Sequence, residues 1–149
     1  MVVIFVLLKI FNINPDLVFS HPHGGIGSMY GTPGDPWAEQ GLACAPQQHV
    51  DSQMHVCAHR TLPCGTVLAI QTTRTKKLGW CIVMDRGPYG AIDDHQVWVI
   101  KVTESDPGQW RGILDMTPAV TKDMEHRGFE PIRFWILRVG RPGKPRLYD

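Results

Sequence analysis

The chain carries almost no excess charge of either sign. Its 149 residues include 15 Lys and Arg against 14 Asp and Glu, which gives a net charge of +1. This balance gives no electrostatic basis for binding nucleic acid or an anionic membrane surface. The chain also has little long apolar sequence, since the most apolar run, residues 2–8, is too short to span a bilayer. A composition of 43% hydrophobic and 19% charged residues is instead typical of a folded protein, and the length predicts one domain.

Regular alternation of strands and helices is also missing, which excludes a doubly wound α/β fold. Short runs rich in β-branched residues are separated by loops rich in glycine and proline, a pattern typical of a small closed β-barrel. Thr117-Pro118 predicts the start of a single helix that ends near Gly128. Residues 42–56 have no clear period and predict a long surface loop, and residues 89–109 an insertion. The predicted strands are residues 27–31, 66–73, 79–84, 113–116 and 132–139, with a strand-like run at 97–102 inside the insertion.

No two of the four cysteines have CxxC spacing, which disfavours a zinc site completed by His49, His55 or His59. An even number of cysteines predicts two disulfides if the protein works outside the cytosol. All three connectivities remain open. The attractive one joins the third cysteine to the fourth, at the ends of a hairpin, and the first to the second. The cysteines are Cys44, Cys57, Cys64 and Cys81.

The two ends of the chain differ in composition from the middle. Residues 1–24 form an apolar segment that predicts either the core of an export signal or an arm that docks on a protein partner. No Lys or Arg precedes this run, Lys9 interrupts it, and no clear cleavage site follows, so an uncleaved or atypical export segment is slightly favoured. Residues 25–140 form the expected barrel domain. Residues 141–149 are a basic tail rich in proline and glycine, typical of a solvated end.

Three polar residues in the middle of the chain can do chemistry. Asp85 ends an apolar strand, where partial desolvation favours a general acid, although it can instead cap its own Gly-Pro turn. His59 precedes another turn, where a lone histidine usually makes structural hydrogen bonds; the alternative is that it holds the substrate or tunes Asp85. Asp115 lies two residues before the helix start, where it either caps the helix or supplies a second carboxylate.

Three segments in this order and spacing resemble the double-psi β-barrel of the rare lipoprotein A (RlpA) family, which is related to expansins and barwin. The similarity spans roughly Gly25 to Val139, and residues 27–31 also resemble the family's first strand, Ala-Ser-Trp-Tyr-Gly. It implies a mainly β, six-stranded double-psi barrel with one short helix and long loops. The matching segments are Ala58–Thr66, in the frame Ala-His-x-Thr-Leu-Pro-x-Gly-Thr, Asp85–Pro88, which reads Asp-Arg-Gly-Pro, and Ile113–Thr117, close to Ile-x-Asp-Leu-Ser.

The resemblance implies roles for several residues. Asp85 matches a catalytic Asp and His59 the catalytic-site His, while Asp115 matches the acid of expansins and family 45 glycoside hydrolases. Asp51 matches an acidic position, and Gln48 stands where many relatives have Glu. Further candidates for substrate binding are Tyr30, Tyr89, Arg86 and Thr61, whereas Trp80, Phe134 and Trp135 are expected in the core.

The function implied is that of a murein lytic transglycosylase, which needs no metal or cofactor. Its substrate would be the glycan strands of peptidoglycan, in the periplasm, the cell envelope or the medium. A hydrolase remains an alternative, as does a non-catalytic glycan-binding module of the expansin or barwin kind. A third alternative is a phage lysin or virion protein whose N-terminal arm docks on a tail or envelope partner.

Overall fold

The computed structural model describes residues 22–35, 41–88, 91–92, 98–99 and 112–140. The predicted N-terminal arm, except for its last three residues, lies outside these residues, as do the basic tail and Tyr89. In the part of the chain that is described, no helix is long and apolar enough to cross a membrane.

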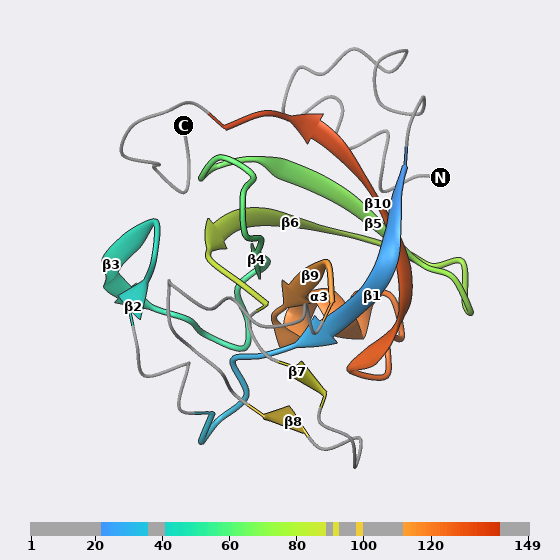
Figure 1. The fold of residues 1–149 in the computed structure, drawn as a ribbon, viewed down its shortest axis with the longest axis horizontal. Coiled ribbons are helices and arrows are strands. Elements are labelled where there is room, and N and C mark those ends of the chain that lie inside the picture. Colours follow the sequence, from blue (N-terminus) through green and yellow to red (C-terminus); the bar gives the residue numbers. More distant parts are fainter. Residues whose placement is uncertain (1–21, 36–40, 89–90, 93–97, 100–111, 141–149) are drawn as a thin grey trace.

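Six strands close into a barrel in the order β1-β10-β5-β6-β4-β9 (Figure 1). Two pairs, β1 with β9 and β4 with β6, are parallel, and the others are antiparallel. This closed, mixed barrel confirms the predicted mainly β class and is compatible with a double-psi topology. The strands are β1 (His23–Met29), β4 (Val56–Ala58), β5 (Val67–Thr72), β6 (Leu78–Asp85), β9 (Leu114–Met116) and β10 (Phe129–Arg138).

Two small sheets and one helix accompany the barrel. The hairpin of β2 (Gly41–Leu42) and β3 (Ala45–His49) lies to one side of the ring in Figure 1, and β7 (Ala91–Ile92) pairs with β8 (Trp98–Val99). Helix α3 (Pro118–Asp123) begins at the predicted Thr117 cap but ends earlier than predicted. The chain enters the left-handed region at Glu125, with φ of 52°, so the helix stops before Gly128 is reached.

The prediction of a loop over residues 42–56 was wrong, because this stretch contains β2 and β3 and leads into β4. All three residues of β4 are buried, so the strand has neither the alternation nor the length that marks a strand in sequence. Strands β2 and β3 together have seven residues, most of them polar or small. These three strands form because they pair with neighbouring strands, and their own residues do not predict them.

The longer strands have apolar residues on both faces. In β5, Val67 and Ala69 join one buried cluster while Leu68 and Ile70 join a second, and all four are fully buried. Burying a large aliphatic side chain stabilises a fold by about 1.5–3 kcal/mol. Because each face of β5 packs in a different buried cluster, both faces must be apolar. This is why the strand reads as a near-continuous apolar run and could be predicted from the sequence.

The disulfides join Cys44 to Cys64 and Cys57 to Cys81. The preferred pairing of Cys64 with Cys81 was wrong, because the β5–β6 register places Cys81 opposite Leu68, four residues beyond Cys64. Cys57 instead lies opposite Val83 on the neighbouring parallel strand, a diagonal step from Cys81. Since no cysteine is free, zinc ligation by cysteine is also excluded.

Candidate active site

Strand register aligns one residue from each of four strands into a single row. Asp85 on β6 lies opposite Ala58 on β4, Ala58 lies opposite Asp115 on β9, and Asp115 lies opposite Ser28 on β1. Neighbouring strands are about 4.8 Å apart, so the Cα atoms of Asp85 and Asp115 are separated by about 10 Å. Only the methyl side chain of Ala58 stands between the two acidic positions.

Asp115 is the buried one of the two carboxylates. It is 9% exposed, and its Oδ1 accepts a hydrogen bond from the hydroxyl of the fully buried Ser28. The N-cap position of α3 belongs to Thr117. The carboxylate of Asp115 thus bridges β9 to β1 in the middle of the barrel wall.

Asp85 is partly exposed and lies where β6 ends. Its Oδ1 accepts hydrogen bonds from the backbone N–H of Arg86, at 2.9 Å, and of Ala43, at 3.0 Å. The first bond agrees with the expected capping of its own turn, and the second attaches the β2–β3 hairpin. Both N–H groups donate to the same oxygen of the Asp85 carboxylate, and the hydroxyl of Tyr30 lies close to this carboxylate.

Tyr30 places a buried hydroxyl close to both carboxylates. The residue is 6% exposed, and its hydroxyl makes no hydrogen bond of good geometry among the described residues, although it lies close to the Asp85 carboxylate. Burial raises the pKa of Tyr30 well above its usual value, and the negative charges of Asp85 and Asp115 and a hydrogen-bonding interaction with Asp85 raise it further. The phenol therefore stays protonated and presents an O–H donor beside Asp85.

His59 follows β4 directly and is held next to Asp85. Its backbone N–H donates to the carbonyl of Asp85 at 3.1 Å, and its Nδ1 accepts from the N–H groups of Thr61 and Leu62 at 3.1 and 3.0 Å. In the neutral ring the proton is then on Nε2. Burial, followed by the charge of Arg86, lowers the pKa of His59 to about 4. At neutral pH, His59 is an uncharged hydrogen-bond donor rather than a proton-transfer group.

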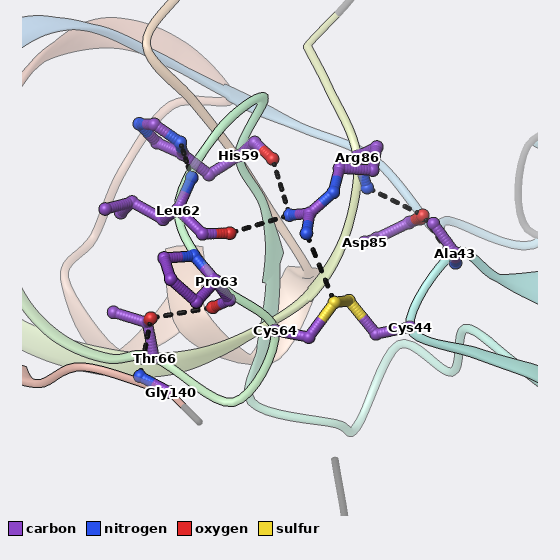
Figure 2. The surroundings of a disulfide bond; sticks show 10 residues. All are labelled: Ala43, Cys44, His59, Leu62, Pro63, Cys64, Thr66, Asp85, Arg86 and Gly140. Atoms are coloured by element: carbon purple, nitrogen blue, oxygen red, sulfur yellow. Dashed lines mark hydrogen bonds between the residues drawn. A yellow bond between two sulfur atoms is a disulfide. The ribbon is translucent and has the colours of Figure 1, made fainter. Parts of the chain in front are cut away.

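Arg86 points away from the Asp85 carboxylate and into the turn that follows His59, as Figure 2 shows. Its Nη1 donates to the carbonyls of His59 and Leu62 at 3.1 and 2.8 Å, and its Nη2 donates to the sulfur of Cys64 at 3.2 Å. Arg86 was expected to bind substrate. In the structure its guanidinium holds the 59–64 loop in place, and its expected role in substrate binding stays a prediction.

The remaining candidates lie apart from the row. Asp51 is exposed, and its Oδ1 accepts from the N–H of Gln53 at 2.7 Å, which closes a local turn. A shallow hollow of about 240 Å³ lies there, between residues 31–35 and residues 50–52. Gly31, one of its lining residues, follows Tyr30 in the chain. Gln48 on β3 and Thr61 are exposed.

Sequence reasoning did not select three residues that build this site. Ser28 lies in the segment that resembles the family's first strand, which is the one signal that points to it. Ala58 precedes His59 in its motif, but only the register shows that it separates the two carboxylates. Nothing in the sequence indicates that the backbone of Ala43 contacts Asp85.

Among the described residues, no group of three or more His, Cys, Asp or Glu side chains could hold a metal ion. No family model matches the chain, and no curated protein matches it. Fold and site together define a class: a disulfide-linked, closed and mixed β-barrel that has two carboxylates in register, a buried tyrosine and a neutral histidine.

Proposed function

We propose that the protein is a glycan-cleaving enzyme of the RlpA-like kind, a lytic transglycosylase that acts on peptidoglycan strands with Asp85 as general acid and base. The observation that carries this proposal is the row formed by Asp85, Ala58, Asp115 and Ser28. Four segments far apart in sequence, each of which resembles part of one family's sequence, supply this row.

The chemistry assigned to Asp85 is a proton transfer in each direction. Protonated Asp85 gives its proton to the glycosidic oxygen as the bond from C1 of the muramoyl residue breaks. The resulting carboxylate, or that of Asp115, takes the proton of the muramoyl 6-hydroxyl, whose oxygen bonds to C1 and closes a 1,6-anhydro ring. No water is consumed. Acid–base assistance of this kind is worth roughly 10²–10⁴ in rate.

Two uncharged donors are assigned to substrate binding beside Asp85. The Tyr30 hydroxyl lies beside the Asp85 carboxylate, and Nε2–H is the donor of neutral His59. Sugars offer many hydroxyl oxygens, which match donors of this kind. Neither residue is assigned a proton transfer, because burial keeps both in their uncharged forms.

The presence of two carboxylates in one row supports one rival chemistry. A glycoside hydrolase uses one carboxyl group as general acid and a second carboxylate to activate water or to attack the sugar. Register places Asp115 in the same row as Asp85. A hydrolase with Asp115 as the second carboxylate is therefore the second candidate.

The setting proposed is outside the cytosol, in the periplasm, the envelope or the medium. Two disulfides and no free cysteine support this, since disulfides persist in oxidising compartments.

Products from purified peptidoglycan sacculi test the proposal. Sacculi would be incubated with the full chain, and the soluble fragments identified by mass spectrometry. Anhydro-muramoyl ends are expected, and reducing ends would show a hydrolase instead. If no fragments form while the protein remains bound to the sacculi, the proposal is overturned in favour of a binding module.

A further inference from the structure

The two disulfides differ in how far a reagent can reach them. Cys57 and Cys81 are both fully buried, in the cluster beneath α3. Cys44 and Cys64 are both partly exposed, on a hairpin and a loop at the surface of the barrel (Figure 2). Because thiol–disulfide exchange needs access to a sulfur atom, only the second bond is open to it in the folded protein.

Arg86 makes Cys64 the better leaving group of this exposed pair. Its Nη2 lies 3.2 Å from the Cys64 sulfur, and its Nη1 is anchored by two carbonyls of the same loop. The positive charge therefore stays beside Cys64 when the bond opens, and a nearby guanidinium stabilises a thiolate. A thiol that is more acidic leaves faster in exchange.

The Cys44–Cys64 bond joins the two segments that frame Asp85. Cys44 follows Ala43, whose N–H donates to the Asp85 carboxylate, and the Cys44 N–H donates to the carbonyl of Met84 at 3.0 Å. Cys64 ends the loop that begins at His59. The hairpin is thus attached to the site from one side by backbone hydrogen bonds and from the other by sulfur.

We propose that Cys44–Cys64 is a thiol-exchange site through which a dithiol reductant releases the β2–β3 hairpin from Asp85. A thiolate of the dithiol attacks the Cys44 sulfur, the disulfide bond breaks, and Cys64 takes the electron pair as a thiolate. The second thiol of the reductant then attacks the mixed disulfide, which frees the Cys44 thiol and leaves an oxidised dithiol. The exchange itself is independent of glycan cleavage, whereas its effect on activity rests on the proposed function.

Selective reduction tests the exchange. The folded full chain would be titrated with dithiothreitol, the free thiols alkylated, and their positions found by peptide mass spectrometry. Cys44 and Cys64 are expected to be labelled first, while Cys57–Cys81 stays oxidised. Reduction of both bonds together, or of the buried bond first, would overturn the proposal.

The pH dependence of alkylation tests the part played by Arg86. In protein reduced only at the exposed pair, Cys64 is expected to react at lower pH than Cys44, and Arg86→Gln is expected to remove most of that difference. The difference in alkylation pH between Cys44 and Cys64 is measured in the wild-type chain, so it does not depend on whether the Arg86→Gln variant folds. Equal profiles for Cys44 and Cys64 in the wild type would contradict the assigned leaving group.

Amide hydrogen exchange tests the release of the hairpin. In a Cys44→Ser, Cys64→Ser protein, the Ala43 amide is expected to exchange several-fold faster, with β5 amides unchanged as the internal control. Unchanged exchange at Ala43 would overturn the release. None of these measurements uses glycan, so selective reduction with no cleavage of sacculi would refute the proposed function and leave the exchange site standing.

Discussion

Tyr30 belongs both to the core and to the site. Its aromatic ring packs in a core cluster, while its hydroxyl lies close to the carboxylates of Asp85 and Asp115. Packing in the core explains why the aromatic ring is present but not why it carries a hydroxyl. In the proposed site, that hydroxyl donates a hydrogen bond to a hydroxyl oxygen of the substrate.

Tyr30→Phe separates these two roles. Removal of a buried hydroxyl that makes no hydrogen bond of good geometry among the described residues is expected to leave the free energy of unfolding unchanged or to raise it by up to about 1–3 kcal/mol. Cleavage of sacculi is expected to fall, because a donor to substrate is lost. Urea unfolding and fragment release would be measured on the same preparation. A variant that is less stable and equally active would contradict the assignment.

His59 predicts a pH dependence of stability at the same scale. Its pKa is about 4 in the folded protein against 6.5 for an ordinary histidine, so the unfolded chain binds a proton at higher pH than the folded one does. Its contribution to stability is therefore complete above pH 6.5, falls as pH drops toward 4, and changes no further below that.

Urea unfolding at several pH values would show this loss as a difference between wild type and His59→Asn. The subtraction is needed because burial also lowers the pKa of His126. If both proteins lose the same stability between pH 6.5 and 4, the environment assigned to His59 is wrong.

At the scale of elements, the sequence predicted the strands whose own residues show an apolar run or an apolar–polar alternation. Residues 67–72 and 78–85 were found largely as expected because burial on both faces demands apolar runs, and residues 129–138 because exposed and buried positions alternate along their first part. Strand β4 could not be found this way, since its three residues become a strand only through the partners on either side. The end of α3 was misplaced because a single positive φ at Glu125 terminates it.

Strand β1 makes a prediction with a matched control. A Cβ added at Gly27 would lie 2.7 Å from Met116 Cε and 2.9 Å from Ile132 Cδ1, whereas at Gly24 the nearest atom is 4.0 Å away. Gly27→Ala is therefore expected to cost about 1–3 kcal/mol through overpacking. Gly24→Ala is expected to be nearly neutral. Chemical denaturation of both proteins tests this, and equal stabilities would contradict the packing described for β1.

At the scale of the whole molecule, the site exists only when the barrel closes. Ser28 and Asp115 are 87 residues apart in sequence, and their strands form the parallel seam between β1 and β9. The motifs indicated which residues are candidates for catalysis and substrate binding. They could not give the register, the spacing of the carboxylates or the disulfide pairing, because those follow from pairings between distant strands.

The buried disulfide stabilises the closed barrel as a whole. Cys57 and Cys81 are 24 residues apart and link β4 to β6. A Cys57→Ala, Cys81→Ala protein is expected to lose about 2–5 kcal/mol of unfolding free energy, as is usual for small disulfide-bonded domains. Calorimetry or urea unfolding would measure this. An unchanged unfolding transition would show that the Cys57–Cys81 bond adds nothing to the stability of the barrel.

The most direct test of the central claim compares Asp85→Asn with the wild type in releasing glycan fragments from sacculi. Asn keeps an oxygen acceptor for the N–H groups of Ala43 and Arg86, so the fold is expected to persist with both disulfides intact. The matched control is Asp123→Asn, whose carboxylate is 47% exposed at the end of α3. The account predicts a rate at least about 100-fold lower for Asp85→Asn and an unchanged rate for the control. Folded Asp85→Asn protein that cuts glycan at the wild-type rate would contradict it.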